Sequence, residues 1–232
     1  MDFNQALPVS AISEERRVAF FRKTYTHLAL AVLLFVIVEA IFFQVTPIIE
    51  FAFTMKQGWR WLLMLGGFML VTNYAEKTAL TNHNRSEQYF GLLLYVIAEA
   101  FIFIPLIGIA MHISAESGEN ILYQAAIVTL SLFTALSAIA FYSKSDFSYL
   151  RSILTIGFFV AIGLMIAGLL FGFNLGLWFS VGMVLLAAGS ILYQTSNMIH
   201  RYSEDQYVGA SLGLFASLLL LFWYVLSILS ND

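Results

Sequence analysis

The chain has 232 residues, of which 60% are hydrophobic and 11% are charged, with a formal net charge of −3 at pH 7. Soluble domains carry about 25% charged residues, so most of this chain has to face lipid rather than water. These figures exclude a water-soluble enzyme and a basic nucleic-acid-binding protein. A secreted disulfide scaffold is excluded because the chain has no cysteine.

The chain starts with a polar segment, residues 1–23, which we expect to be a cytoplasmic tail. It lacks the short apolar region that precedes the cleavage site of a secretory signal peptide. Residues 1–13 are polar and nearly uncharged, and we expect them to be disordered. A partner protein could bind such a tail.

Seven windows in residues 24–229 are long and apolar enough to cross a membrane as helices, which takes about 20 residues each. In chain order they are 24–45, 58–75, 88–111, 121–142, 151–173, 175–200 and 208–229. The window at 58–75 is the weakest, because Gly66, Gly67, Thr72 and Asn73 dilute its apolar residues. The sequence therefore predicts an all-α integral membrane protein with seven transmembrane helices in one domain.

The distribution of cations predicts the orientation, because cytoplasmic loops hold the excess of Lys and Arg. With seven spans, nine of the 11 cations fall on one side: Arg16, Arg17, Arg22, Lys23, Lys77, Arg85, Lys144, Arg151 and Arg201. Only Lys56 and Arg60 fall on the other side. The N-terminus is therefore expected inside and the C-terminus outside.

Two glutamates lie inside the predicted spans: Glu39 in the first and Glu99 near the middle of the third. An ionisable residue at this depth is costly and marks a functional candidate. Pro105 and Gly108 follow Glu99 and can distort the helix so that backbone carbonyls line a cavity. Each glutamate is either a proton- or cation-sensing group or a protonated, purely structural one.

The sixth window carries a polar stripe on one helical face, formed by Ser190, Gln194, Asn197 and Arg201 at spacings of four, three and four. His200 closes this stripe at the membrane boundary, as a pH-responsive group or as a simple interfacial histidine. Such a stripe faces protein or water rather than lipid.

The seventh window carries small residues at Gly209, Gly213 and Ser217, a spacing that lets two helices approach closely. Together with the polar stripe, they predict a close contact between the last two spans, with Gln194 and Ser217 at mid-depth.

Catalysis and metal binding have no support in the sequence. The four histidines lie near the boundaries of different spans and lack the spacing of metal ligands: His27, His83, His112 and His200. No lysine lies inside a span to hold retinal, and no nucleotide-binding motif is present. We expect no enzymatic activity, no metal, no cofactor and no nucleic-acid partner.

The segment after the fourth window, Ser143-Lys144-Ser145-Asp146-Phe147-Ser148-Tyr149-Leu150, resembles the Thr/Ser-Lys-x-Asp-Phe-Ser-x-Leu signature of the Bax-inhibitor family. Ile104-Pro105-Leu106 is similar to the end of that family's third helix, where a Gly-Pro pair is usual. The run from Ile191 to His200 is similar to the bacterial YccA branch.

The resemblance implies six helices around a central seventh. It also implies either a pH-gated calcium leak or, for the YccA branch, modulation of the FtsH protease in the inner membrane. Leak-type members hold a pair of aspartates in the last two helices. The matching positions here are Gln194 and Ser217, neither of which titrates.

Two functions therefore remain open. The first is modulation of an FtsH-type membrane protease or quality-control complex through the N-terminal tail, which the sequence slightly favours. The second is a pH-sensitive calcium or cation leak with Glu99 or Glu39 as the proton-sensing group. A small-molecule transporter has no substrate-specific motif to support it. In each case the partners include the lipid bilayer of the cell's inner membrane.

Overall fold

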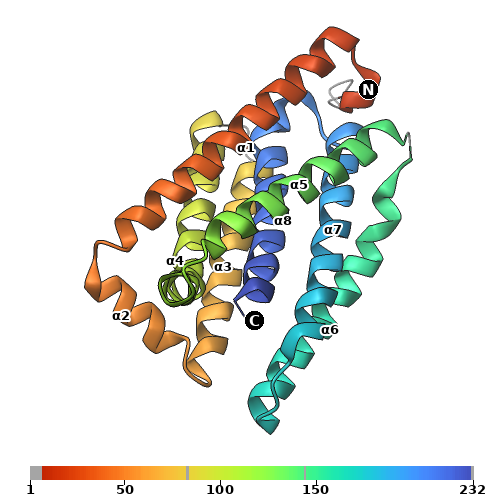
Figure 1. Cartoon of the computed structure of the whole chain (residues 1–232). Coiled ribbons are helices and arrows are strands. Elements are labelled where there is room, and N and C mark those ends of the chain that lie inside the picture. Colours follow the sequence, from red (N-terminus) through yellow and green to blue (C-terminus); the bar gives the residue numbers. More distant parts are fainter. Residues whose placement is uncertain (1–6, 82–83, 144, 231–232) are drawn as a thin grey trace.

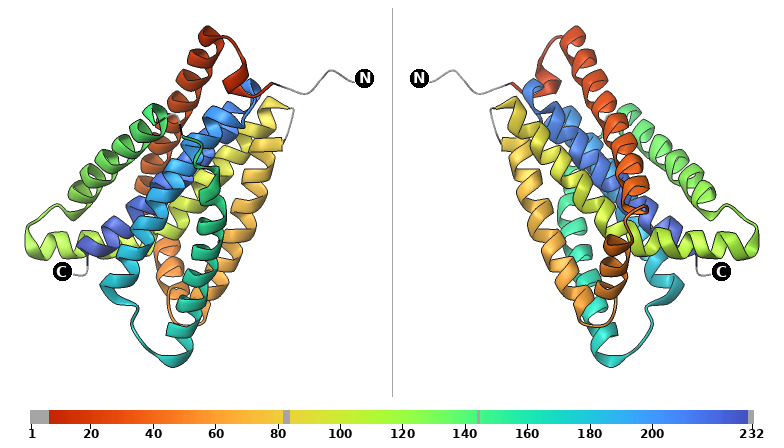
Figure 2. Two further views of the ribbon diagram at one scale, coloured as in Figure 1. Left: turned by 90° about the vertical axis from the view of Figure 1, so that its right-hand side faces the viewer. Right: turned by 90° about the vertical axis from the view of Figure 1, so that its left-hand side faces the viewer.

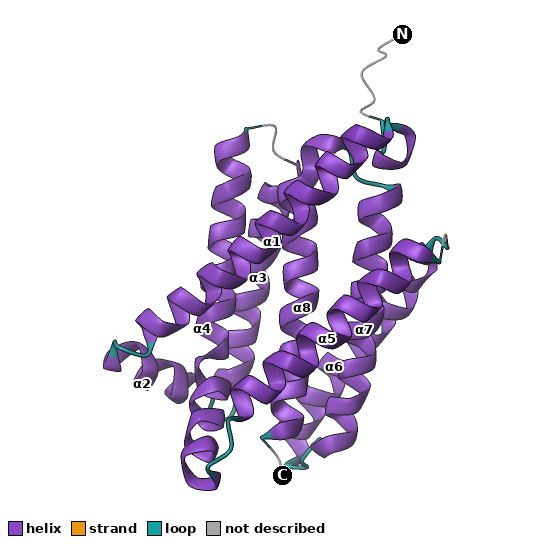
Figure 3. Cartoon of the chain, turned by 45° about the horizontal axis from the view of Figure 1, so that its top comes forward, coloured by secondary structure: helices purple, strands orange, loops and turns teal. Residues whose placement is uncertain are grey.

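The computed structural model describes residues 7–81, 84–143 and 145–230. Over these residues the chain is helical and contains no strand, only an isolated bridge between Pro8 and Ser203 (Figures 1 and 3). The α-helices are α1 (Glu14–Phe42), α2 (Thr46–Met55), α3 (Arg60–Thr81), α4 (Arg85–Ser117), α5 (Ile121–Tyr142), α6 (Leu150–Phe171), α7 (Gly176–His200) and α8 (Tyr207–Leu229). Short 3-10 turns are η1 (Val9–Ala11), η2 (Phe147–Tyr149) and η3 (Glu204–Gln206). The predicted all-α membrane fold is confirmed.

Among the described residues, six helices are long and apolar enough to cross a membrane: α1, α4, α5, α6, α7 and α8. Helix α3 has 22 residues but is less apolar, because Asn73, Glu76 and Lys77 lie in its second half. It nevertheless runs alongside α4 and packs against α8 (Figure 1). The count of seven spans and the orientation of the termini therefore stay predictions, and this packing supports the count.

Helix α8 occupies the centre of the bundle. Most of its residues are buried, and it packs against α1, α3, α4, α5 and α7 (Figure 2). Helix α6 lies outermost and packs mainly on α7, and only Ala161 and Gly168 of its residues are buried. The last helix is therefore central, as expected, with five helices packed closely around it rather than six.

Two boundaries differ from the sequence predictions. Helix α1 begins at Glu14 rather than at residue 24, with Glu14 and Glu15 in its first turn, where negative charge favours helix formation. Helix α2 was not predicted. It starts with Pro47 in its first turn, a position that suits proline, and its 10 residues are too few to cross a membrane.

The expected disorder of residues 1–13 is wrong for residues 7–13, while residues 1–6 lie outside the described part. The side chain of Val9 is fully buried, and its backbone N–H donates to the Tyr202 carbonyl at 2.8 Å. Burial of one apolar side chain and one backbone hydrogen bond hold this segment against the loop between α7 and α8.

That loop, residues 201–206, fixes the start of α8 relative to the other helices. Glu204 forms an ion pair with Arg16 of α1, and Asp205 forms one with Arg85 of α4 at 3.3 Å. Gln206 donates from its side chain to the Leu80 carbonyl of α3 at 3.2 Å. The end of the bundle that holds this loop is therefore linked across four helices.

Candidate functional site

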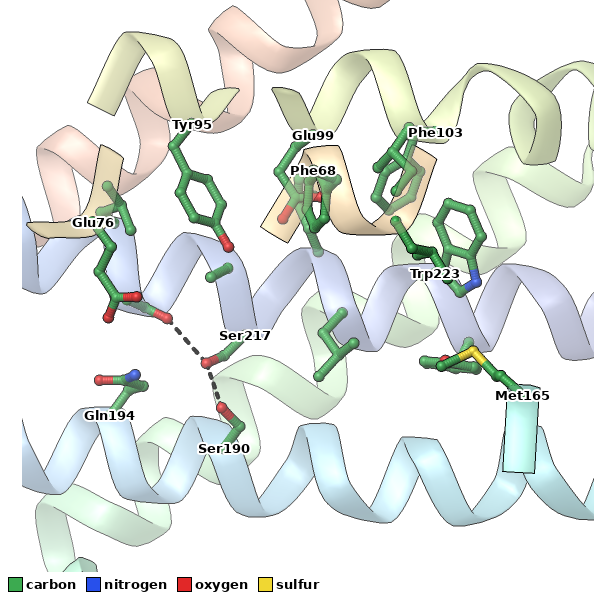
Figure 4. A pocket seen from close by; sticks show the side chains of 18 of the residues that line it. Phe68, Glu76, Tyr95, Glu99, Phe103, Met165, Ser190, Gln194, Ser217 and Trp223 are labelled. Atoms are coloured by element: carbon green, nitrogen blue, oxygen red, sulfur yellow. Dashed lines mark hydrogen bonds between the residues drawn. The ribbon is translucent and has the colours of Figure 1, made fainter. Parts of the chain in front are cut away.

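A cleft of about 320 Å³ lies between α3, α4, α7 and α8, with Met165 of α6 at its edge. It runs along the helices, with polar side chains gathered at one end and aromatic side chains at the other (Figure 4). The polar end is lined by Glu76, Tyr95, Glu99, Ser190, Gln194 and Ser217. The aromatic end is lined by Trp61, Phe68, Phe103, Trp223 and Tyr224.

Glu99 is the buried acid of this cleft. Only 7% of the residue is exposed, and it lies in the middle of α4. Tyr95, one turn earlier on the same helix, is also buried and brings its hydroxyl within interaction range of the Glu99 carboxyl group. The cleft thus holds a carboxyl group at mid-helix depth beside a hydroxyl group.

Hydroxyl groups of α7 and α8 continue the polar end. The Ser217 hydroxyl donates to the Gly213 carbonyl at 3.0 Å, so Ser190 donates to Ser217 across a distance of 2.8 Å (Figure 4). A Cβ atom at Gly213 would come within 2.9 Å of the Gln194 Oε1 atom. An alanine at this position would therefore require the Gln194 side chain to shift away from α8.

The predicted contact between the last two helices is present, but its details differ. Ser217 is paired with Ser190 rather than with Gln194, although both Ser217 and Gln194 line the cleft. Gly209 faces α3, where an added Cβ would lie 2.4 Å from the Leu80 side chain. Gly209 of α8 thus packs against α3, whereas Gly213 packs against Gln194 of α7.

The aromatic end is a wall of packed rings. The rings of Trp61 and Trp223 are stacked with their centroids 6.2 Å apart. Phe103 meets Trp223 edge to face at 4.9 Å. Aromatic pairs prefer such offset and edge-to-face arrangements, so this wall is well defined.

Glu76 is a site residue that the sequence analysis missed. It lies beyond the predicted window 58–75, but α3 continues to Thr81 and carries it into the cleft. Burial raises the pKa of the Tyr202 hydroxyl, and the nearby Glu76 carboxylate raises it further. The helical spacing of Leu65, Phe68 and Glu76 could have placed Glu76 on this face if the helix had been extended.

The structure does not bring the two predicted glutamates together. Glu39 lies on α1 with only 6% of the residue exposed, and it is not among the residues that line the cleft. Both of its carboxyl oxygens are buried without a hydrogen-bond partner in the described part of the chain. Glu99 and Glu39 are thus equally buried acids in different places.

The polar stripe of α7 divides between two surroundings. Ser190 and Gln194 line the cleft. Asn197 is buried near the end of α7, and His200 is the last residue of this helix. The Nδ1 atom of His200 contacts the Ser196 carbonyl at 3.0 Å. Half of the stripe therefore belongs to the end of α7 rather than to the cleft.

The loop between α5 and α6 carries the family signature, residues 143–150, and is hydrogen-bonded to Ser196 of α7. The Ser196 hydroxyl accepts from the Phe147 backbone N–H at 2.9 Å and donates to Asp146 at 3.2 Å. Asp146 also accepts from the Ser148 backbone N–H at 2.9 Å. Lys144, the remaining signature residue singled out from the sequence, lies outside the described residues.

These contacts predict a pH-dependent contribution of Asp146 to stability. The backbone hydrogen bond from Ser148 lowers the pKa of Asp146 below its ordinary value of 3.8, helped by the Ser196 hydroxyl and the His200 ring. A lowered folded-state pKa stabilises the fold above the ordinary value, and this stability is lost as the pH falls through the folded-state pKa.

We therefore expect Asp146→Asn to lower the melting temperature in detergent at pH 6, and to lower it by less as the pH falls below 3.8. A deficit of equal size at pH 6 and below pH 3.8 would show that the charge is not responsible. Ser196→Ala should lower the stability by about 0.5–1.5 kcal/mol at pH 6, because it removes the hydrogen bond to the partly buried Phe147 N–H.

The three described histidines, His27, His112 and His200, lie on three different helices. His27 stacks on Tyr89 with ring centroids 5.6 Å apart, and His112 pairs with Glu116 at 3.3 Å. His83 lies outside the described residues. Within the described part of the chain, no group of three His, Cys, Asp or Glu residues could hold a metal ion.

The chain is similar to proteins of one known family. The family model described as "Inhibitor of apoptosis-promoting Bax1" matches residues 17–232. The chain is 28% identical to Bax inhibitor 1 of Schizosaccharomyces pombe over 98% of this chain and 82% of that protein. It is 29% identical to mouse Protein lifeguard 4 over 98% of this chain and 91% of that protein.

A bacterial relative is similar over a shorter stretch. Protein PA2604 of Pseudomonas aeruginosa is 35% identical over 119 residues, which is 51% of this chain and 53% of that protein. The match to the YccA branch expected from the sequence stays a prediction.

Proposed function

This chain belongs to the Bax inhibitor family of membrane proteins, and from that premise we propose that it lets cations or protons leak through the cleft between α3, α4, α7 and α8. We place it in the cell's inner membrane with its N-terminus inside. The observation that carries the proposal is Glu99, a buried carboxyl group in the middle of a membrane helix that opens onto a cleft.

The charge balance of the cleft supports cations as the permeating species. Glu76 and Glu99 both line it, and within the described part of the chain no lysine, arginine or histidine does. Acidic side chains within membrane helices mark ion or proton pathways. Glu76 lies toward the end of α3 and is exposed, so the two acids lie at different depths along one path.

The substituted aspartate positions fit this proposal. Gln194 and Ser217, where leak-type relatives are expected to carry aspartates, line the same cleft as the two glutamates. The acidic groups are thus placed on α3 and α4 instead of α7 and α8. We infer that the charge has moved across the cleft while the cleft itself has kept its acidic character.

Flux through liposomes tests the proposal. The purified protein should carry cations, measured with potassium and with calcium, above the level of protein-free liposomes, and the flux should change between pH 5 and pH 8. Flux at the protein-free level at every pH, for both ions, would contradict it.

Modulation of an FtsH-type protease stays a prediction. The segment expected to carry it includes residues 7–13, which are packed against the loop between α7 and α8. Residues 1–6, the rest of that segment, lie outside the described residues. Recovery of the protease complex with and without residues 1–6 would test the role of this segment.

A further inference from the structure

The two ends of the cleft suit different chemical groups, because one end is acidic and the other is aromatic. One end presents the carboxyl groups of Glu76 and Glu99, and the other presents the rings of Phe103 and Trp223 (Figure 4). Trp61 also lines the cleft and stacks on Trp223. A metal ion would use only the first end, since calcium is bound by six to eight oxygen atoms. The aromatic wall is left unexplained by a leak of simple ions.

We propose that the cleft binds an amphiphilic organic cation, with its ammonium group beside Glu99 and its apolar body against Trp61, Phe103 and Trp223. The inference shares the cleft with the proposed function and names a class of ligand for it. The volume of about 320 Å³ falls in the range of small-molecule sites, which begins near 300 Å³.

The charge of the ligand follows from the lining residues. Among the described residues, two acids and no basic side chain line the cleft, so a cation is the complementary charge. Quaternary ammonium groups are also attracted by the faces of tryptophan and other aromatic rings within about 6 Å. A neutral ligand of the same shape would gain the apolar contacts without either electrostatic attraction.

Binding of benzyltrimethylammonium tests the inference, with neopentylbenzene as its neutral isostere. Trp61 and Trp223 lie in the wall, so tryptophan fluorescence of the protein in nanodiscs reports occupancy. Trp59 and Trp178 are 66% and 84% exposed and give a background signal. We expect the cation to bind at least about tenfold more tightly than the isostere, a difference of 1.4 kcal/mol.

A matched pair of variants locates the charge. Glu99→Gln should weaken binding of the cation by about tenfold, whereas Glu39→Gln, which changes an equally buried acid outside the cleft, should leave it unchanged. Equal affinity for the cation and the isostere would overturn the inference, and that comparison needs no variant to fold. Equal loss in both variants would overturn the placement beside Glu99.

The binding experiment and the flux experiment test the ligand site and the leak independently of each other. Selective binding of the cation without ion flux would uphold the organic-cation site and reject the leak. Flux without selective binding would uphold the leak and reject the site.

Discussion

Replacing Glu99 by glutamine is expected to bring cation flux close to the level of protein-free liposomes and to remove its variation with pH. Glutamine has nearly the shape of glutamate but carries neither a charge nor an ionisable proton. Glu99 is 7% exposed and lines the cleft at mid-helix depth. The variant therefore removes the ionisable carboxyl group from the proposed path while leaving the packing of α4 almost unchanged.

Glu39→Gln is the control for this result. Glu39 is 6% exposed and lies on α1, outside the cleft. The same chemical change at the same degree of burial should leave both the size of the flux and its pH dependence intact. If Glu39→Gln abolished the flux and Glu99→Gln did not, the path would have to run elsewhere in the bundle.

The second large effect is expected at Gly91, where α3 and α4 are in close backbone contact. A Cβ atom at Gly91 would lie 2.6 Å from the Ala75 carbonyl oxygen and 2.9 Å from the Ala79 backbone nitrogen. A side chain could change its rotamer to relieve this clash, but backbone atoms cannot, so the two helices would have to separate. We expect Gly91→Ala to destabilise the protein by about 1–3 kcal/mol, the usual cost of overpacking.

Gly67→Ala provides the comparison, because an added Cβ there meets nothing within 4 Å. Alanine is the better helix former by about 1 kcal/mol, so this variant should be as stable as the parent or more stable. Thermal unfolding in the same detergent measures both variants. Equal stability of the two would show that the α3–α4 contact is looser than the structure indicates.

Much of the fold could be predicted because apolar stretches of membrane length are local features of a sequence. Helix α2 and the early start of α1 were missed, since a length rule for spans does not register a short helix or a polar first turn. The central position of α8 was expected from the family resemblance, and its small residues indicated close packing. These small residues could not show that Gly209 faces α3 while Gly213 faces α7.

The candidate site was predicted in part. Glu99 stood out because an acid inside an apolar window is rare, and Gln194 and Ser217 were singled out by family position. Glu76 was missed because it follows the window, and only the continuation of α3 carries it into the cleft. The pairing of Ser217 with Ser190 depends on the register of α7 against α8, which no spacing within one helix determines.

The most direct test of the central claim, that cations pass through this cleft, uses the absence of native cysteine. Ala216 lines the cleft and is partly exposed, and Ala138 of α5 is partly exposed but lies outside it. Each is changed to cysteine and modified with a cationic methanethiosulfonate reagent, and flux is measured before and after. Loss of flux is expected for Ala216→Cys alone. Unchanged flux through fully modified Ala216→Cys would contradict the claim.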